Sequence, residues 1–259
     1  MATEYSGSGD PARSMALLWR TRERPSRKAA PELSVDRIVA AAIEIADADG
    51  MAAISMRRVA QRLGVGTMSL YTHVPGKAEL VDVMLDAAYG EVAVGEHSCQ
   101  DWRSRLEWLA RQSWDLYHRH PWMVQVGTDR PVLGPNAMAR YEDQLHALEG
   151  LGLSGIEMDA VVSLVEGHVE GAARRSLEAA STQRRTGVSD EQWWQARAPF
   201  LERLADAGRY PTASRVGTVV GAAFGSAHAP EHVFEFGLRR ILDGVAMLVG
   251  QRCTEGDPD

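Results

Sequence analysis

Apolar residues recur at spacings of three and four along most of this 259-residue chain, which is the period of helices with one buried face. No stretch shows a convincing strand pattern, so the sequence predicts an all-α protein. Glycine and proline separate the periodic segments and mark their ends. Helices are predicted over residues 34–50, 55–64, 67–73, 76–88, 101–119, 121–127, 135–150, 154–182, 190–207 and 231–250.

The helices near the N-terminal end of this series have clear start and stop signals. Ser34 and Ser55 are suitable N-caps, and Gly50 and Gly64 are placed to end the same two helices. After a Gly-Val-Gly turn, Pro75 stops a third, short helix. Two short helices joined by a glycine-bearing turn are typical of a helix-turn-helix DNA reader.

The distribution of charge supports the same interpretation. Residues 1–77 contain 11 basic and 8 acidic side chains, whereas residues 78–259 contain 17 basic and 27 acidic ones. The overall charge of -7 therefore hides a locally basic region. The stretch from Ser55 to Lys77 has four basic residues and no acidic one, which favours contact with nucleic acid.

The composition predicts four parts of the chain. The first, rich in Ser, Gly, Pro and Ala, is expected to be a mobile arm with basic residues at Arg22, Arg24 and Arg27. This arm is either a solvated tail or a segment that lies in a DNA minor groove. The parts are an arm over 1–33, a DNA-binding domain over 34–88, a helical ligand-binding and dimerisation domain over 101–251 and an acidic tail over 252–259.

Several classes of protein are disfavoured. No apolar run is long enough to cross a membrane, and the N-terminus lacks a secretory signal, so we expect a cytoplasmic protein. Cys99 and Cys253 are neither clustered nor at metal-ligand spacing. Nucleophile-elbow, P-loop and dinucleotide motifs are absent, and neither enzyme activity nor a cofactor is expected.

A metal site needs separate consideration, because the second half of the chain has close pairs of possible ligands. His118 and His120 are separated by one residue, and Glu166, His168 and Glu170 fall within one predicted helix. Two histidines at this spacing suit a strand better than a helix. The two glutamates are as easily a solvated or pocket-lining pair, so no metal site is assigned.

The segment VAQRLGVGTMSLYTHVPGKAEL, preceded by an amphipathic helix, resembles the DNA-binding domain of the TetR family of transcriptional regulators. The segments WDLYHRHPWM and GPNAMARYEDQLHAL are similar to the ligand domain of its tetracycline-repressor branch. The resemblance implies an all-helical homodimer, usually a repressor, that leaves a palindromic operator when a small molecule binds the larger domain. Efflux or antibiotic-related genes are frequent targets of this family.

Side chains at the start of the third helix are placed to reach base edges in a major groove. These are Thr67, Met68 and Thr72, with Ser69 near the DNA backbone. Arg57 matches a family position that reads guanine, although a phosphate contact is the alternative. The resemblance assigns phosphate contacts to Tyr71, His73 and Lys77, and Ser55 serves as a cap and possible phosphate donor; Tyr71 could instead pack in the core. Arg58 and Arg62 are left unassigned.

The second domain is expected to bind a drug-sized molecule in a mostly apolar pocket with a few polar groups. Trp122 and Met123 follow Pro121 on a segment that, in the family, joins the DNA-binding domain to the pocket. Two long predicted helices, 154–182 and 231–250, have apolar stripes and small residues, and we expect them to pair across a two-fold axis. The candidate ligand-binding residues are Trp114, His118, Trp122, Met123, Tyr141, Gln144, Glu166, Glu170 and Phe200.

The sequence therefore predicts a homodimeric repressor that binds double-stranded operator DNA and is released by a small, largely aromatic effector. A transcriptional activator, or a regulator that responds to a protein partner, is the alternative. Nothing in the sequence separates these possibilities.

Overall fold

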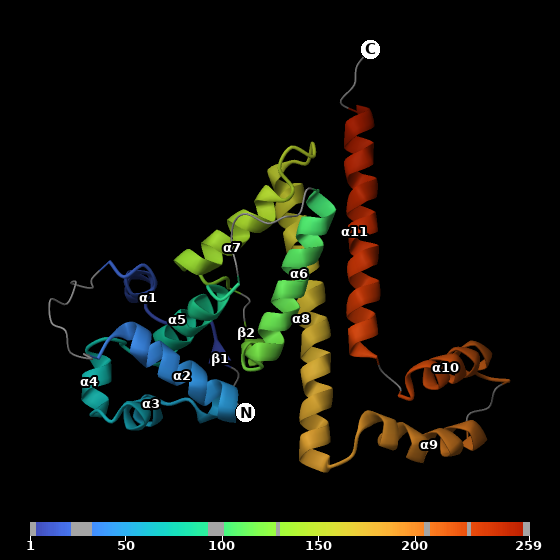
Figure 1. Cartoon of the computed structure of the whole chain (residues 1–259), viewed down its shortest axis with the longest axis horizontal. Helices are drawn as coiled ribbons and strands as arrows, with labels where there is room; N and C mark the ends of the chain where they lie inside the picture. Colours follow the sequence, from blue (N-terminus) through green and yellow to red (C-terminus); the bar gives the residue numbers. More distant parts are fainter. Residues whose placement is uncertain are drawn as a thin grey trace.

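The computed structural model describes residues 4–21, 33–92, 101–127, 130–204, 208–226 and 229–255. Helices form almost all the regular structure of these residues (Figure 1), and the all-α prediction is confirmed. The exception is a parallel pair of two-residue strands, β1 and β2, which begin at Glu4 and Val126. The elements are β1 (Glu4–Tyr5), α1 (Pro11–Leu18), α2 (Val35–Asp49), η1 (Met51–Ala53), α3 (Met56–Leu63), α4 (Thr67–Tyr71), α5 (Lys77–Tyr89), α6 (Trp102–Arg119), η2 (Met123–Gln125), β2 (Val126–Gly127), α7 (Pro135–His146), α8 (Gly155–Thr186), α9 (Asp190–Leu204), α10 (Pro211–Phe224) and α11 (Pro230–Glu255).

The DNA-binding region consists of α2 to α5. The side-chain oxygens of Ser34 and Ser55 each accept a hydrogen bond from a backbone N–H in the first turn of the following helix, so both predicted N-caps are present. Gly64 ends α3 with a φ of +69°, a left-handed conformation that favours glycine. The short turn lets α4 pack across α3 through the buried side chain of Leu70. The helix-turn-helix prediction is confirmed.

Helix α5 connects the DNA-binding region with the rest of the molecule. It packs against α2 on one side and against α1 and α7 on others. Apolar side chains fill these contacts, as expected for a connector, but Glu79, Asp82 and Asp86 are also buried on this helix. Buried carboxylates need hydrogen-bond donors, and the partners of these three residues decide how α5 is held.

The larger region contains α6, α7, α8 and α11. Helix α8 starts with a capping box, in which Ser154 and Glu157 each bond the other's backbone N–H. It packs along α11 within the chain (Figure 1), and Nε2 of His168 lies 2.9 Å from the carbonyl oxygen of Phe234. Gly237 lies against the His168 ring, where a Cβ atom would collide. The pairing of these helices across a two-fold axis stays a prediction.

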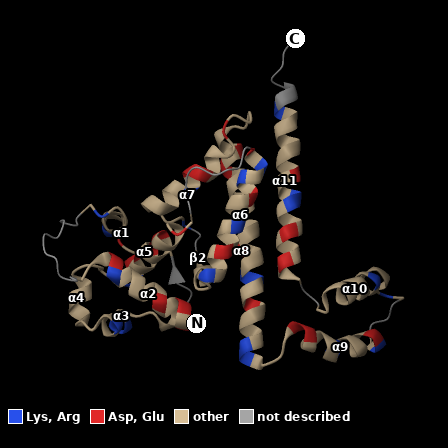
Figure 2. Ribbon diagram, viewed as in Figure 1, with Lys and Arg blue, Asp and Glu red and all other residues tan. Residues whose placement is uncertain are grey.

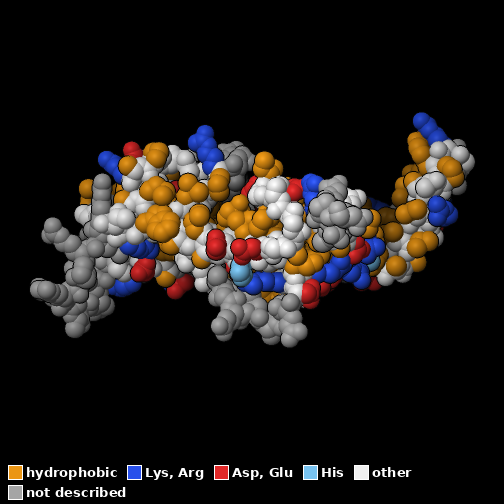
Figure 3. Space-filling view, turned by 90° about the horizontal axis from the view of Figure 1, so that it is seen from above, with side chains coloured by type: hydrophobic (Ala, Val, Ile, Leu, Met, Phe, Trp, Pro, Cys, Tyr) orange, Lys and Arg blue, Asp and Glu red, His pale blue; other side chains and the backbone are white. Residues whose placement is uncertain are grey.

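Helices α9 and α10 project from the larger region (Figure 1). None of their residues is buried, and all of them are described. Figure 3 shows hydrophobic side chains on the surface of this projection. Phe200, Leu204 and Val219 of these two helices are 57%, 83% and 63% exposed. The sequence did not predict α10, because Gly217 and Gly221 interrupt its pattern and glycine is a poor helix former.

The expectation of a mobile arm over residues 1–33 is wrong for much of its length. Asp10 caps α1, Pro11 occupies its first position, and Leu17 and Leu18 are buried. The sequence pattern does not reveal this helix, because its few apolar residues pack against residues that are distant in the sequence. The basic residues Arg22, Arg24 and Arg27 lie outside the described residues, although the chain on both sides of them is placed.

Two further expectations need correction. Residues 121–127 do not form a helix: they form the 3₁₀ turn η2 and then β2, because Val126 and Gly127 pair with the distant β1. The predicted tail from residue 252 begins as the last turn of α11, and residues 256–259 lie outside the description. Among the described residues, no helix is long and apolar enough to cross a membrane.

Candidate DNA-binding and effector sites

The predicted base-reading residues lie on the outer face of α4. Leu70 and Val74 are fully buried and attach this helix to the core. Met68, on the opposite face, is 76% exposed, which is unusual for so large an apolar side chain. The other predicted contacts on and near this helix are exposed or half-buried: Thr67, Ser69, Tyr71, Thr72 and His73. An exposed face on the second helix of a helix-turn-helix motif is the geometry that a major groove requires.

Figure 2 shows basic residues on α3. The three arginines of this helix differ in their contacts. Arg58 forms an ion pair with Asp49, and Arg62 forms one with Glu44 at 2.7 Å, so both are bonded back to α2. Arg57 is exposed and has no hydrogen-bond or ion-pair partner among the described residues. It is therefore the arginine of α3 that is available for a ligand. The family resemblance singled out Arg57, but the sequence did not show that Arg58 and Arg62 are paired with α2.

The start of α5 presents backbone N–H groups beside Lys77. Gly76 precedes this helix in an extended conformation and supplies no side-chain cap. The first N–H groups of a helix lack partners within the helix and carry a partial positive charge, so they can bind a phosphate. Tyr71 is 44% exposed and lies outside the hydrophobic core. This exposure disfavours the alternative in which Tyr71 packs in the core.

A buried polar cluster, formed by Ser113, Arg140, Gln144 and Glu166, lies between α6, α7 and α8. The guanidinium of Arg140 lies 2.7 Å from one carboxylate oxygen of Glu166 and donates to the Ser113 hydroxyl at 2.5 Å. Nε2 of Gln144 donates to the other Glu166 oxygen at 2.5 Å. Ser113, Arg140 and Gln144 are each less than a tenth exposed. Such groups are stable in a core only while they remain paired.

Two tyrosines lie next to this buried polar cluster. The guanidinium of Arg140 lies 5.1 Å from the ring centre of Tyr89, and Tyr117 is buried nearby on α6. Burial raises the pKa of both phenols. Burial is the largest influence on the pKa of Arg140 and acts to lower it. The charge and hydrogen bond of Glu166, together with the nearby Tyr117 and Tyr89, outweigh burial, and the net shift is upward. Both the arginine and the phenols therefore keep their protons at neutral pH.

The predicted residues Trp114 and His118 lie in a second, aromatic group. The Trp114 ring stacks on Phe234 with centres 4.4 Å apart, and His118 contacts the ring of Trp114 as well as the Ser176 hydroxyl. The groove beside them has a volume of about 450 Å³. It is lined by Arg111, Trp114, Asp115, Glu231, His232, Phe234 and Glu235.

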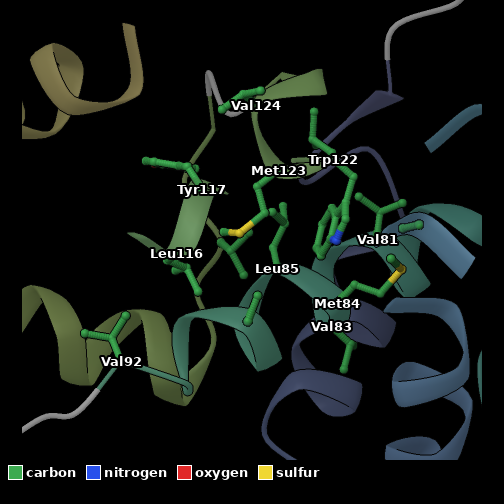
Figure 4. Close-up of a cluster of buried hydrophobic side chains, with 14 of the residues drawn as sticks. Val81, Val83, Met84, Leu85, Val92, Leu116, Tyr117, Trp122, Met123 and Val124 are labelled. Carbon is green, nitrogen blue, oxygen red and sulfur yellow. The ribbon is translucent and has the colours of Figure 1, made fainter. Parts of the chain in front are cut away.

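Trp122 and Met123 lie in the core at the junction between the two regions. Figure 4 shows both pointing into a cluster of buried side chains that includes Met84 and Leu85 of α5. The indole N–H of Trp122 donates to Asp47 of α2 at 2.9 Å. These two residues therefore link the larger region, which we call the effector region, to the DNA-binding region (Figure 4). They are not part of the buried polar cluster.

The remaining predicted ligand residues are not brought together. Tyr141 donates to Asp159, Glu170 is paired with Arg174, and Phe200 is exposed on α9. Sequence reasoning included Gln144 and Glu166 but missed Arg140, Ser113 and the two tyrosines. A usable signal was the spacing of Arg140 and Gln144, which places both on one face of a helix.

The histidines considered for metal binding are bonded to other groups. His118 contacts Ser176, and Nδ1 of His120 lies 2.8 Å from Asp47. In the part of the chain that the structure describes, no group of three or more His, Cys, Asp or Glu residues is arranged to hold a metal ion.

An exposed reader helix on a small helical domain, joined through α5 to a larger helical domain with a buried polar cluster, defines a helix-turn-helix transcriptional regulator. Two family models match this chain: bacterial regulatory proteins of the tetR family over residues 38–84, and the tetracyclin repressor-like C-terminal domain over residues 95–249. The chain belongs to the TetR family.

Named relatives and solved structures agree with this assignment. The chain is 46% identical to the HTH-type transcriptional repressor DrrR1 of Streptomyces coeruleorubidus, over 99% of this chain and 93% of that protein. It is 28% identical to the class A tetracycline repressor protein from transposon 1721 of Escherichia coli, over 83% and 91% of the two chains. Apo ActR from Streptomyces coelicolor superposes with a TM-score of 0.71 and 28% identity, covering 86% of this chain and 99% of that one. ActR has also been solved with actinorhodin, with a TM-score of 0.70 and 27% identity, covering 84% and 97%.

Proposed function

We propose that this protein is a homodimeric repressor that binds a palindromic operator and is released from it by a small, largely aromatic molecule. The observation that carries the proposal is the position of α7. Arg140 and Gln144 of this helix belong to the buried polar cluster, while the N–H groups of Asn136 and Ala137 in its first turn donate to Asp86 of α5. A ligand that rearranges the cluster displaces α7, and α7 is bonded to the helix that follows the reader.

On DNA, we propose that Arg57 reads a guanine beside the bases contacted from α4. Arginine can bond guanine O6 and N7 together, which discriminates by about 1–3 kcal/mol. Arg57 has no partner among the residues that the structure describes, and this supports the proposed role. Thr67, Met68 and Thr72 are proposed as the α4 base contacts. Ser55, Ser69, Tyr71, His73 and Lys77 are proposed as phosphate contacts.

Binding titrations on the operator and on operators with single base changes test this assignment. Arg57→Ala is expected to relax preference at one base pair of each half-site, whereas Lys77→Ala weakens all sequences alike and reduces the salt slope by about 0.9. Arg58→Ala is the matched control, because Arg58 is already paired with Asp49. Equal losses on every sequence for Arg57→Ala would show that Arg57 contacts only phosphate.

The effector is proposed to bind at the buried polar cluster. Arg140 and Gln144 can donate to carbonyl, phenol or carboxylate oxygens, and Tyr89 and Tyr117 offer rings for stacking. The relatives support a planar polycyclic ligand, since ActR was solved with actinorhodin. We expect the regulated gene to be an efflux or antibiotic-related gene.

Actinorhodin and tetracycline are suitable first probes. Tryptophan fluorescence reports binding, and the anisotropy of a labelled operator reports release. Gln144→Ala is expected to raise the probe concentration needed for release about tenfold, because a buried hydrogen bond is lost. Gln195→Ala, on the exposed face of α9, is the matched control and should behave as the wild type. Quenching without release of DNA would contradict the proposed coupling.

The dimer is proposed to form through the exposed apolar face of α8 and α11. Leu164 on α8 and Phe236 and Met247 on α11 are 54%, 52% and 68% exposed, although the opposite faces of both helices are buried in the chain. A face of this kind is typical of an interface. Phe236→Asp is expected to yield a monomer by sedimentation. Val188→Asp, on an apolar residue outside this face, is the control and should remain dimeric.

An activator, or a regulator that answers to a protein, remains the alternative function. Mapping the operator relative to the promoter separates activation from repression.

The basic segment between α1 and α2 is proposed to add a minor-groove contact. Replacing Arg22, Arg24 and Arg27 with alanine tests it, and unchanged operator affinity would remove this contact from the proposal.

A further inference from the structure

The N-terminal segment, residues 4–21, begins by pairing with the effector region. β1 lies parallel to β2, so Tyr5 is opposite Gly127. The hydroxyl of Ser6 then donates to the carbonyl oxygen of Arg130 at 2.5 Å, and its backbone N–H donates to that of Gly127 at 2.9 Å. The chain turns at Gly7, where φ is +64°, and leaves the effector region.

The middle of the segment binds the buried carboxylates of α5. The N–H of Gly7 donates to Asp82 at 2.9 Å, and the N–H of Asp10 donates to Glu79 at 3.3 Å. At Gly9 the backbone is so close to α5 that a Cβ atom would lie 2.7 Å from a Glu79 carboxylate oxygen. These contacts explain why two acidic side chains are buried on a connector helix: they hold the backbone of the N-terminal segment.

The end of the segment returns to the effector region. Helix α1 packs on α5, and the indole N–H of Trp19 donates to the carbonyl oxygen of Leu133 at 2.8 Å. The next residue, Arg20, is bonded to Asp36 in the first turn of α2 at 2.6 Å. The segment is therefore attached to the effector region at two points, to α5 between them and to α2 at its end.

We propose that residues 4–21 form a strap that positions the DNA-binding region relative to the effector region, with Ser6, Gly9 and Trp19 as positioning residues. The strap adds a further connection between α5 and the effector region, separate from the covalent chain, from the contact of Asp86 with α7 and from the core around Met123 (Figure 4). Its first anchor, β2, directly follows η2, which carries Met123 of the junction core. A displacement of η2 is then transmitted to α5 through β2, β1 and the two carboxylates.

This inference rests on the proposed function only for its effect on operator affinity. A strap holds the two regions in the arrangement that fits both half-sites, and its release lowers the fraction of molecules in that arrangement. The apparent affinity falls by the same factor as this fraction, about tenfold if a tenth of the molecules remain competent.

Two variants of the full-length protein, one double and one single, weaken opposite sides of the strap. Ser6→Ala combined with Trp19→Phe removes the side-chain hydrogen bonds of the strap to the effector region. The backbone pairing of β1 with β2 and the contact with α5 are left in place. Gly9→Ala places a Cβ atom against the Glu79 carboxylate, so that the strap and this side chain must separate. The bonds of the strap to Gly127 and Leu133 are left in place. Arg13→Ala, at an exposed residue of α1 whose side chain has no partner among the described residues, is the matched control.

Hydrogen exchange and operator binding without effector are measured for each variant. We expect both variants to exchange about tenfold faster in β2 and at the start of α5, from the loss of one or two hydrogen bonds, and to bind the operator about tenfold more weakly. The control should match the wild type. A strap that only stabilises α5 predicts a different result: Gly9→Ala would weaken binding, but the Ser6 and Trp19 double variant would not.

Normal operator affinity in the double variant, with normal exchange in α5, would overturn the proposal. The exchange measurement does not depend on DNA. If the wild-type protein failed to bind its mapped operator, the proposed function would fail, while the exchange rates would still decide whether the strap connects the two regions.

Discussion

Polar side chains are arranged in opposite ways in the two functional regions. Around α4 they are exposed, and Arg57 has no partner among the described residues, so binding to DNA breaks no intramolecular bond of this side chain. In the effector region the buried side chains of Arg140 and Gln144 are both bonded to Glu166, which is only partly exposed. A ligand that enters there must replace existing hydrogen bonds. The first arrangement suits binding to a fixed surface, and the second suits a switch that stays in one state until a matching ligand arrives.

The strongest test of this contrast is Arg140→Ala, which should destabilise the protein by about 3 kcal/mol because it leaves Glu166 without its buried cation. Urea denaturation measures the change. Arg174→Ala is the matched control, since its pair with Glu170 lies near the surface and should contribute less than about 1 kcal/mol. Similar losses of stability in Arg140→Ala and Arg174→Ala would show that the buried polar cluster stabilises the protein no more than an exposed ion pair does.

A smaller effect is expected at the link between the regions. Asp86→Ala removes the acceptor for two N–H groups at the start of α7, and the free energy of unfolding should fall by about 2 kcal/mol. Asp86→Asn keeps one acceptor oxygen and should lose less. Urea denaturation at neutral pH measures the free energy of unfolding of both variants. Equal decreases for Asp86→Ala and Asp86→Asn would contradict the capping role of Asp86.

A comparison of the wild type with Asp86→Asn gives a prediction about the pH dependence of stability. Burial raises the pKa of Asp86, although the N–H groups of Ala137 and Asn136 oppose this. The folded state therefore holds the proton more tightly than the unfolded state, and the contribution of Asp86 to stability is lost as pH rises above the ordinary value of about 3.9. The stability of the wild type relative to Asp86→Asn should fall with rising pH from about 4 upward. A rise would contradict the burial of this carboxyl group.

In the DNA-binding region the expected effects are local. Ser55→Ala removes the N-cap of α3 and should cost about 1 kcal/mol, measured by thermal or urea unfolding. Ser55→Asp restores the cap and should recover the stability, but it places a negative charge toward a proposed phosphate contact. Normal operator affinity in the Asp variant would remove Ser55 from the DNA interface.

The smallest effect is expected for Arg62→Ala. Its pair with Glu44 is exposed on both sides, so the loss of stability should stay below about 1 kcal/mol. Operator affinity should change less than in Arg57→Ala under the same salt conditions. If Arg62→Ala weakens operator binding as much as Arg57→Ala does, an arginine that is paired with α2 can still contact DNA. The ion pairs of α3 would then not identify the DNA contacts.

The DNA-binding region could be predicted from the sequence because its determinants are local. Ser34 and Ser55 cap the helices that follow them, Gly64 supplies a left-handed residue, and Pro75 ends the reader helix. Each of these signals acts within a few residues along the chain. The helix boundaries and the exposed face of α4 follow from them.

The effector site could not be predicted in the same way, because its determinants are distant in sequence. Ser113, Arg140 and Glu166 come from three helices, and only their packing brings them together. The pairing of β1 with β2 likewise joins residues more than a hundred positions apart. Gln144 and Glu166 could be proposed as polar groups of an apolar pocket, but the sequence could not show that they meet, or that Phe200 and Trp122 lie elsewhere.

The separation between β1 and its partner also sets an order of events in folding. Residues 4–21 leave the ribosome before Gly127 and Leu133, to which they bond and which follow more than a hundred residues later. During synthesis the helices from α2 to α5 can therefore form before the N-terminal segment closes over them, since local contacts form faster than distant ones. The nascent DNA-binding region is then attached to the effector region through this segment only when the segment has paired with β2 and Leu133.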